Sequence, residues 1–406
     1  MRPIVVDLFS GVGGFSLGFE AAGFDIGAAV EIDPVHAAAH QFNFPGCKTI
    51  CQDIKNLHPS RIAVANEIDC LIFGSPCQAF SVQGVQDPND PRATLGLEAL
   101  RMILALRPKY FVMENVPAIL LAKNKHILQD LIDKFAQGGY EVVRPFQSLN
   151  AKGFGVPQNR DRLFVLGYRL DCPPPRYPEK ENTISTVGDF IFDLAGVTEF
   201  VGKDLGIDAQ VLNNHTILSG TNIRDRFSQC HVRQGRERIW GHLGSKHSEK
   251  VKERFALTQH GKTEPISRFH KLAVDRLCPT LVAGTPASKG SHTAKRPIHF
   301  KYPRCITIRE AARLHGYPDW FQFSRTIWSG MRQVGNSVCP PVAQAIAKEI
   351  IKVLGAKPSQ PKLLPRLDEE LLSFGNIQAA EYFATDPKLN GGRVKKTLKL
   401  KAITLK

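Results

Sequence analysis

Short β-branched runs alternate with amphipathic stretches over the first part of the chain, as far as about Tyr168. Apolar runs bounded by turn residues predict strands at 4–8, 27–32, 70–73, 110–114, 140–149 and 162–167. Helical periodicity between them predicts helices at 14–22, 34–42, 95–106 and 125–137. Alternation of this kind is typical of an α/β fold with a doubly wound, mostly parallel sheet.

The pattern changes at the three consecutive prolines 173–175, which predict a stiff extended connector. Beyond them the periodicity weakens and arginine, lysine and histidine become frequent, until helical patterns return at 307–314 and 342–353. The segment from about 356 contains several prolines and ends in a lysine-rich stretch. The sequence leaves open whether this tail is disordered or is a short added element that touches nucleic acid.

Composition narrows the class of protein. The chain has 406 residues with 43% hydrophobic and 22% charged residues, which is ordinary for a soluble globular protein. It shows no apolar run long enough for a bilayer, no signal-peptide pattern and no paired cysteine spacing, so we expect a cytoplasmic protein without a metal site. The net charge of +15 indicates a polyanionic partner, most commonly nucleic acid.

A glycine-rich turn at residues 7–15 follows the first predicted strand and opens a helix. Glycines there allow a ligand to approach the backbone, but the spacing is tighter than in dinucleotide-binding turns. Glu31 follows the second strand, where a carboxylate suits a ribose diol, and Asp53 is placed to meet an adenine amino group. This order favours S-adenosylmethionine over a dinucleotide, although the acids could instead be simple helix caps.

A cysteine follows the 70–73 strand within Gly74-Ser75-Pro76-Cys77-Gln78. Open α/β sheets present reactive groups at this position, and Pro76 restricts the backbone that carries the thiol. By itself the pattern is weak, because a cysteine after a strand is most often a small buried apolar residue. A second strand-end motif, Glu114-Asn115-Val116, makes a reactive site the better interpretation.

Taken in order, these motifs resemble those of the cytosine-C5 DNA methyltransferases. The resemblance covers roughly residues 1–355 and is carried by the segments 7–15, 74–81, 114–116, 158–162, 309–314 and 333–338, together with Glu31 and Asp53. It implies a Rossmann-like S-adenosylmethionine-dependent enzyme that methylates C5 of cytosine in a specific double-stranded DNA sequence.

The resemblance also implies catalytic roles for Cys77, Glu114, Arg160 and Arg162. Cys77 would add to C6 of cytosine, and Arg162 would support the thiolate and orient the base at O2. Glu114, held protonated by burial, would donate a proton to N3. Since C6 is inaccessible inside a duplex, the target nucleotide would be flipped into the pocket.

The cofactor contacts expected from the turn and the resemblance lie at the ends of the first strands and in the closing motif. They are Phe9, Ser10, Gly11, Gly13, Gly14, Phe15, Glu31, Ile32, Asp53, Ile54, Gly74, Pro76, Asn336 and Ser337.

The DNA contacts expected are Ser81, Arg92, Gln158, Arg233, Arg236 and Arg238. The first two lie in a loop after Cys77 that resembles the family's mobile loop, and the last three lie in the basic middle. The implied organisation is a cofactor-binding and catalytic domain (1–175 with 331–355), a smaller, irregular target-recognition domain (176–330) and the basic tail (356–406).

We therefore expect a prokaryotic, monomeric enzyme associated with nucleoid DNA that protects host DNA alongside a restriction endonuclease, a partner that it does not bind. Three other functions stay open. A tRNA methyltransferase would usually carry a shorter recognition region, a non-catalytic DNA-binding regulator would not need an intact Cys77, and a dinucleotide oxidoreductase would not need the paired strand-end motifs.

Overall fold

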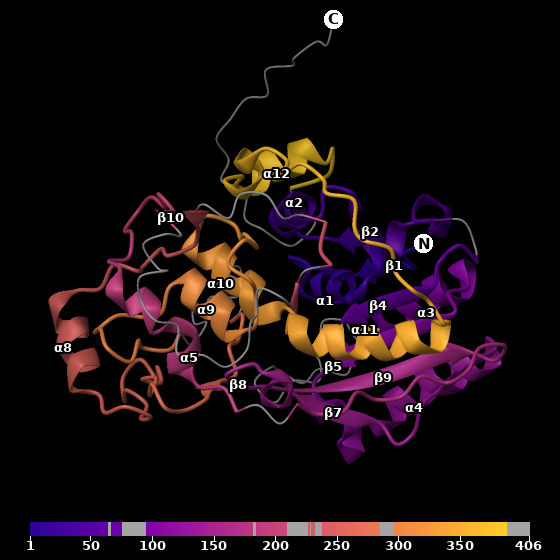
Figure 1. Cartoon of the computed structure of the whole chain (residues 1–406), viewed down its shortest axis with the longest axis horizontal. Helices are drawn as coiled ribbons and strands as arrows, with labels where there is room; N and C mark the ends of the chain where they lie inside the picture. The colour runs from indigo at the N-terminus through magenta and orange to yellow at the C-terminus, as the bar shows by residue number, and fades with distance from the viewer. Residues whose placement is uncertain are drawn as a thin grey trace, which may run out of the picture.

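The computed structural model of the chain describes residues 1–63, 66–74, 95–181, 184–208, 226–227, 229–231, 238–284 and 296–387. Its centre is an eight-stranded sheet with the order β3-β2-β1-β4-β5-β9-β6, in which β7 also pairs with β9. Figure 1 shows the elements that surround this sheet. The strands are β1 (Ile4–Leu8), β2 (Asp25–Glu31), β3 (Lys48–Cys51), β4 (Cys70–Gly74), β5 (Tyr110–Asn115), β6 (Tyr140–Val142), β7 (Gln147–Asn150) and β9 (Asp161–Arg169).

Strands β1 to β5 run parallel, and β9 runs antiparallel to β5. Alternate residues of the strands enter two separate cores: Val5 and Ile72 belong to one hydrophobic cluster, whereas Val6 and Phe73 belong to the other. The first cluster includes residues of α1 (Gly14–Ala22), α2 (Pro34–Asn43) and α11 (Pro340–Leu354), and the second includes residues of α3 (Leu95–Leu106) and α4 (Ala122–Gln137). Helices on both faces of a mostly parallel sheet confirm the predicted doubly wound α/β fold.

Two strand predictions differ from the structure. The segment predicted as one strand over 140–149 forms two, β6 and β7, because the chain turns at Pro145, which has no N–H to donate to a ladder. Strand β3 was not predicted, since Lys48–Cys51 is short and half polar; its pairing with β2 defines it as a strand.

The segments between β9 and α11 contain shorter elements: α5 (Val187–Ile191), β10 (Ile207–Asp208), β11 (Arg238–Ile239), α8 (Glu249–Leu257), β12 (Cys278–Pro279), α9 (Ile308–Leu314) and α10 (Ile327–Asn336). Strand β12 pairs in parallel with β8 (Gln158–Asn159), which immediately precedes β9. A two-residue ladder thus connects this irregular part to the segment that leads into β9.

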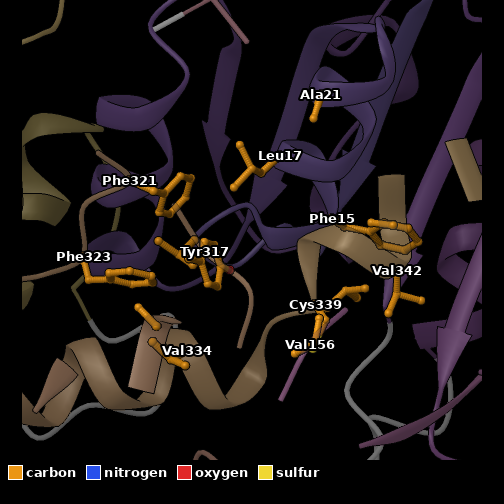
Figure 2. Packing of buried hydrophobic residues seen from close by; sticks show 14 of the residues in the cluster. Phe15, Leu17, Ala21, Val156, Tyr317, Phe321, Phe323, Val334, Cys339 and Val342 are labelled. Atoms are coloured by element: carbon orange, nitrogen blue, oxygen red, sulfur yellow. The ribbon is translucent and has the colours of Figure 1, made fainter. Parts of the chain in front are cut away.

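A continuous apolar core also joins the two parts. Figure 2 shows Phe15 of α1 near Val342 of α11, and Val334 of α10 near Tyr317 and Phe323. All five side chains belong to the first hydrophobic cluster. Helix α10 is therefore held by the same core that supports the sheet.

Helix α9 begins at a complete capping box. The Thr307 hydroxyl accepts from the Glu310 N–H, while the Glu310 carboxylate accepts from the Thr307 N–H. Glu310 is fully buried and accepts two hydrogen bonds from Arg304, each 2.9 Å long. Hydrogen bonds and charge from Arg304 outweigh the effect of burial and lower the pKa of Glu310 to about 2.

The chain continues beyond α11 into a segment that crosses back over the sheet domain. It forms a short 3₁₀ helix, η7 (Glu369–Leu372), and α12 (Asn376–Tyr382), which lies beside α2 in Figure 1. Leu371, Leu372, Ala379 and Ala380 are buried there. None of the helices within the described ranges is long and apolar enough to cross a membrane.

Candidate active site

The site lies where the chain order in the sheet reverses. From β1 the chain moves outward through β2 to β3, and it then returns to β4 on the other side of β1. In open α/β sheets, ligands bind outside the carboxyl ends of the strands at such a reversal of strand order. The glycine-rich turn follows β1, and Gly74 ends β4.

The turn after β1 adopts an unusual backbone. Phe9 (φ 59°), Gly11 (φ 55°) and Gly13 (φ 98°) all lie in the left-handed region, which a non-glycine residue such as Phe9 seldom adopts. A Cβ atom built on Gly11 would meet no heavy atom of the described residues within 4 Å. The backbone at Gly11 therefore faces open space in which a ligand could approach it closely.

Glu31 fixes this turn from the end of β2. Its two carboxylate oxygens accept hydrogen bonds from the N–H groups of Gly11 and Asp33, each 2.8 Å long. Burial raises the pKa of Glu31. The Ser10 hydroxyl is buried beside it without a hydrogen-bond partner within the described residues. A carboxylate and an unpaired hydroxyl next to an open glycine backbone fit a ligand that carries hydroxyl groups.

Two neighbouring acids, Asp33 and Asp53, are helix caps, which is the alternative that the sequence left open. Asp33 is the N-cap of α2 and accepts from the N–H groups of Val35 and His36. Asp53 is the N-cap of the 3₁₀ helix η1 (Ile54–Asn56), where one carboxylate oxygen accepts from the Lys55 N–H. Glu31, in contrast, caps no helix, and this leaves it as the acid best placed for a ligand.

The other predicted cofactor residues occupy more than one kind of position. Phe15 is buried in the core against Phe19 and Phe164. Gly14 lies against the segment after α10, because a Cβ there would come within 2.4 Å of the Val338 carbonyl oxygen. Ile54 is buried, whereas Ile32 and Gly74 are partly exposed at the ends of β2 and β4. At the end of α10, Asn336 is exposed, and the Ser337 hydroxyl donates to the Val334 carbonyl. Pro76 lies outside the described residues.

A buried polar network beneath the turn was not assigned a role from the sequence. The Ser16 hydroxyl donates to the Asp7 carboxylate at 2.6 Å and lies 3.2 Å from His40 Nε2. Burial raises the pKa of Asp7 to about 7 and lowers the pKa of His40 to about 3, so His40 is neutral at physiological pH. A Cβ on Gly13 would come within 2.9 Å of the His40 ring, which places this network directly under the turn.

The predicted reactive groups meet at the ends of three adjacent strands. Gly74 of β4 pairs with Glu114 of β5, and Glu114 pairs with Phe164 of β9. Arg162 of β9 forms a 2.9 Å ion pair with Glu114, and both side chains are mostly buried. Cys77 lies three residues beyond Gly74, outside the described residues. Strand β4 therefore ends beside the Glu114–Arg162 pair, three residues before Cys77 in the sequence.

Arg160, which was predicted to be catalytic, acts in the structure as a connector. It is buried, and its guanidinium donates to the carbonyl oxygens of Leu281, Gly335 and Ser337 at 2.8–3.1 Å. These contacts join β9 to the segment after β12 and to the end of α10. The geometry gives Arg160 a positioning role for the residues around the site.

The predicted DNA contacts divide into two groups. Ser81, Arg92, Arg233 and Arg236 lie outside the described residues. Arg238 is exposed on β11 and donates one hydrogen bond to the Leu205 carbonyl oxygen. Gln158 is fully buried: its side-chain amide donates to the Leu314 carbonyl oxygen and accepts from the Leu281 N–H. The prediction that Gln158 contacts DNA is therefore replaced by a structural role.

Several basic residues of the middle segment also have internal partners. Arg226 forms a bidentate pair with Glu181, and Lys271 donates to the Phe255 carbonyl oxygen. His242 is fully buried, and burial lowers its pKa. Sequence alone could not separate these residues from exposed ones, because their partners come from distant segments.

Comparisons with known proteins agree with this geometry. Residues 4–352 match the family model of C-5 cytosine-specific DNA methylase, and the chain belongs to that family. It has a Rossmann-like methyltransferase fold and is a DNA cytosine-5 methyltransferase by family. It is 42% identical to the Type II methyltransferase M.XorII of Xanthomonas oryzae over 400 residues, which cover 94% of this chain and 92% of the relative.

Two further relatives extend the comparison. The chain is 31% identical to the Type II methyltransferase M.DdeI of Desulfomicrobium norvegicum over 381 residues, covering 85% of this chain and 88% of the relative. It also superimposes, with a TM-score of 0.73 and 31% identity, on an E. coli prophage-encoded protein described as a DNA modification methyltransferase, covering 87% of this chain and 100% of the other.

Proposed function

We propose that the protein methylates C5 of cytosine within a specific double-stranded DNA sequence and uses S-adenosylmethionine as the methyl donor. The observation that carries this proposal is the Glu114–Arg162 pair at the ends of β5 and β9, beside the strand that leads to Cys77. While C6 of the base is attacked, the polar edge of the base must be held in place. A carboxyl group and a guanidinium group on adjacent strands can bind that edge by hydrogen bonds.

Residues of the turn would hold the cofactor. Glu31 and Ser10 present an acceptor and a hydroxyl for ribose, and the open backbone at Gly11 permits close approach. When bound, S-adenosylmethionine supplies an electrophilic methyl group. The fit of these residues to a ligand that carries hydroxyl groups supports the assignment.

The chain's own residues would carry out the remaining chemistry. The Cys77 thiolate adds to C6, and the electron pair of the C5–C6 bond moves to C5, which becomes nucleophilic. The Glu114 carboxylate takes up a proton from solvent and passes it to N3, while Arg162 holds the base at O2 and stabilises nearby negative charge. After C5 has been methylated, removal of its proton restores the double bond and releases Cys77 as a thiolate.

The recognition step would belong to the irregular segment 176–330, while 1–175 and 331–355 would bind the cofactor and carry out catalysis. The target nucleotide would leave the duplex to reach the crevice, because its C6 is otherwise stacked between neighbouring bases. The relatives M.XorII and M.DdeI are Type II methyltransferases. We therefore propose that this enzyme serves a restriction-modification system and shares its target sequence with a cognate endonuclease.

Trapping the covalent adduct tests this proposal. DNA containing 5-fluorocytosine should accumulate a complex with the protein that survives denaturing electrophoresis, because fluorine cannot leave C5 as a proton does. Cys77→Ser should form no such complex and should still bind S-adenosylmethionine. A stable complex formed equally well by Cys77→Ser would contradict the assignment of the nucleophile.

A further inference from the structure

Helix α10 carries a narrow exposed stripe. Trp328, Arg332 and Asn336 recur at four-residue intervals, so they lie along one side of the helix. Trp328 and Asn336 are exposed and Arg332 is partly exposed, whereas Met331, Val334 and Gly335 on the other side are buried. Figure 2 shows Val334 near Tyr317 and Phe323 in the core. The stripe is thus the face of α10 that the fold leaves uncovered.

One end of this stripe reaches the candidate active site. The Gly335 carbonyl accepts a hydrogen bond from Arg160, which lies two residues from Arg162. A Cβ on Gly335 would come within 2.5 Å of the Ala283 backbone nitrogen, so this end of α10 packs tightly beside the site. At the helical rise, Trp328 lies about 12 Å along the axis from Asn336. A duplex with one nucleotide in the site would extend over a surface at that distance.

The outer part of the stripe is a cation–π pair. The Arg332 guanidinium carbon lies 4.5 Å from the centroid of the Trp328 ring, and the Trp328 side chain is 40% exposed. Within the described residues, Arg332 has no carboxylate partner, and its Nε is buried without a hydrogen-bond acceptor. An arginine that is held by an aromatic ring and lacks a counterion suits a phosphate, and the exposed tryptophan suits the adjacent sugar.

A second arginine–tryptophan pair provides an internal control. Arg325, just before α10, lies 4.5 Å from the ring of Trp240, the same distance as in the first pair. Arg325 differs because the Glu369 carboxylate of η7 pairs with its guanidinium. The backbone N–H of Arg325 also donates to the Leu372 carbonyl. Its charge is therefore neutralised by the chain itself, whereas no carboxylate among the described residues neutralises that of Arg332.

We propose that Trp328 and Arg332 bind the sugar–phosphate backbone of the DNA beside the target cytosine. Arg332 pairs with a phosphate, and Trp328 packs against the neighbouring deoxyribose. The contact rests on the proposed function, since it requires DNA in the crevice. This contact would hold the DNA backbone next to the target nucleotide, which must rotate out of the duplex. It would not distinguish one base sequence from another.

The test compares Arg332→Gln and Trp328→Ala with the matched variant Arg325→Gln. Binding is measured by fluorescence anisotropy on a short labelled duplex centred on a cytosine that the wild-type enzyme methylates, over a series of salt concentrations. Arg332→Gln should weaken binding about tenfold and reduce the salt slope by about one unit, as loss of one phosphate contact does. Trp328→Ala should weaken binding and leave the salt slope nearly unchanged, and Arg325→Gln should preserve both quantities.

Two further measurements make the result decisive. Affinity for S-adenosylmethionine, measured by calorimetry without DNA, should be unchanged in all three variants, and Arg332→Lys should restore the salt slope. Wild-type DNA affinity and salt slope in Arg332→Gln would overturn the contact, as would equal losses in Arg325→Gln or a parallel loss of cofactor affinity. Wild-type methylation of the duplex is the separate check: if it is absent, the proposed function fails rather than the contact alone.

Discussion

At the scale of single residues, the site depends on a few buried polar groups with defined partners. Glu31 binds two backbone N–H groups and thereby couples the end of β2 to the turn after β1. Arg162 faces Glu114 across two adjacent strands. These pairs set the positions of the groups that would meet the cofactor and the base before either ligand arrives.

Replacing Glu31 with alanine should weaken S-adenosylmethionine binding about tenfold or more. The substitution removes an acceptor for a ribose hydroxyl and also frees the Gly11 N–H that shapes the turn. Calorimetric titration of the DNA-free protein measures the change. Glu98→Ala, which removes a carboxylate on α3 that pairs with Arg101, provides the control and should bind normally. Unchanged affinity in Glu31→Ala would argue against the ribose contact.

A buried acid in α1 predicts a pH dependence of stability. Burial raises the pKa of Glu20 from 4.5 to about 7. Between these values the folded state keeps a proton that the unfolded chain has lost, so wild-type stability should fall as pH rises from about 4.5 to about 7 and then level off. Glu20→Gln removes this dependence, so its free energy of unfolding relative to that of the wild type should rise by up to about 3 kcal/mol from acid to neutral pH.

Urea unfolding of both proteins at about pH 5 and about pH 8 measures that difference. Glu381→Gln, at an exposed position in α12, gives the baseline for losing one carboxyl. A Glu20→Gln advantage that is the same at both pH values would show that Glu20 is ionised equally in the folded and unfolded states.

The residue scale is also where prediction from sequence was least complete. Motif order led to the prediction of site roles for Glu31, Glu114 and Arg162, because residue type and position after a strand are visible in the chain. It could not show that Gln158 and Arg160 turn inward, since the carbonyl groups that they bind belong to Leu281, Leu314 and residues 335–337. Contacts between segments so far apart have no local signature.

At the scale of elements, local pattern predicted most of the sheet domain. Helices α1 and α3 have the predicted bounds, and β1 does as well. These segments are rich in apolar residues because most of their side chains are buried: α1 is buried from Gly14 to Ala21, and β1 from Val5 to Leu8. Strand β3 and the division between β6 and β7 were not predicted, since short strands at or near a sheet edge depend on their partner for definition.

The segment after α11 is an integral element of the fold in its described part. Leu372 is 1% exposed, and its carbonyl accepts from the Arg325 N–H. Arg366 donates to the Trp320 carbonyl and lies over the ring of Phe42 in α2. These contacts connect α2 to the region before α10. The tail thus contributes core residues up to α12, whereas the sequence suggested either disorder or an added element.

Leu372→Ala should therefore destabilise the protein by about 2–5 kcal/mol, as removal of a buried leucine side chain does. Leu363→Ala is the matched control in the same segment: its side chain is 50% exposed, so the change should stay within about 0.5 kcal/mol. Denaturant unfolding monitors both variants. Equal stability of the two variants would mean that the segment around η7 does not pack as described.

At the scale of the whole molecule, one hydrophobic core supports both the sheet and the irregular part that follows it. The pairing of β12 with β8 and the three carbonyl contacts of Arg160 place the segments after β12 and α10 next to β9. The net charge of +15 adds an attraction for a polyanion over the whole surface.

Methyl transfer to DNA tests the account most directly. Purified protein is incubated with labelled S-adenosylmethionine and either unmethylated duplex DNA or tRNA, and the products are sequenced after bisulfite conversion. The account predicts protected cytosines at one recurring sequence in the duplex, label in DNA only, and no label with Cys77→Ser. Label confined to tRNA, or no label in either substrate with the wild-type protein, would contradict it.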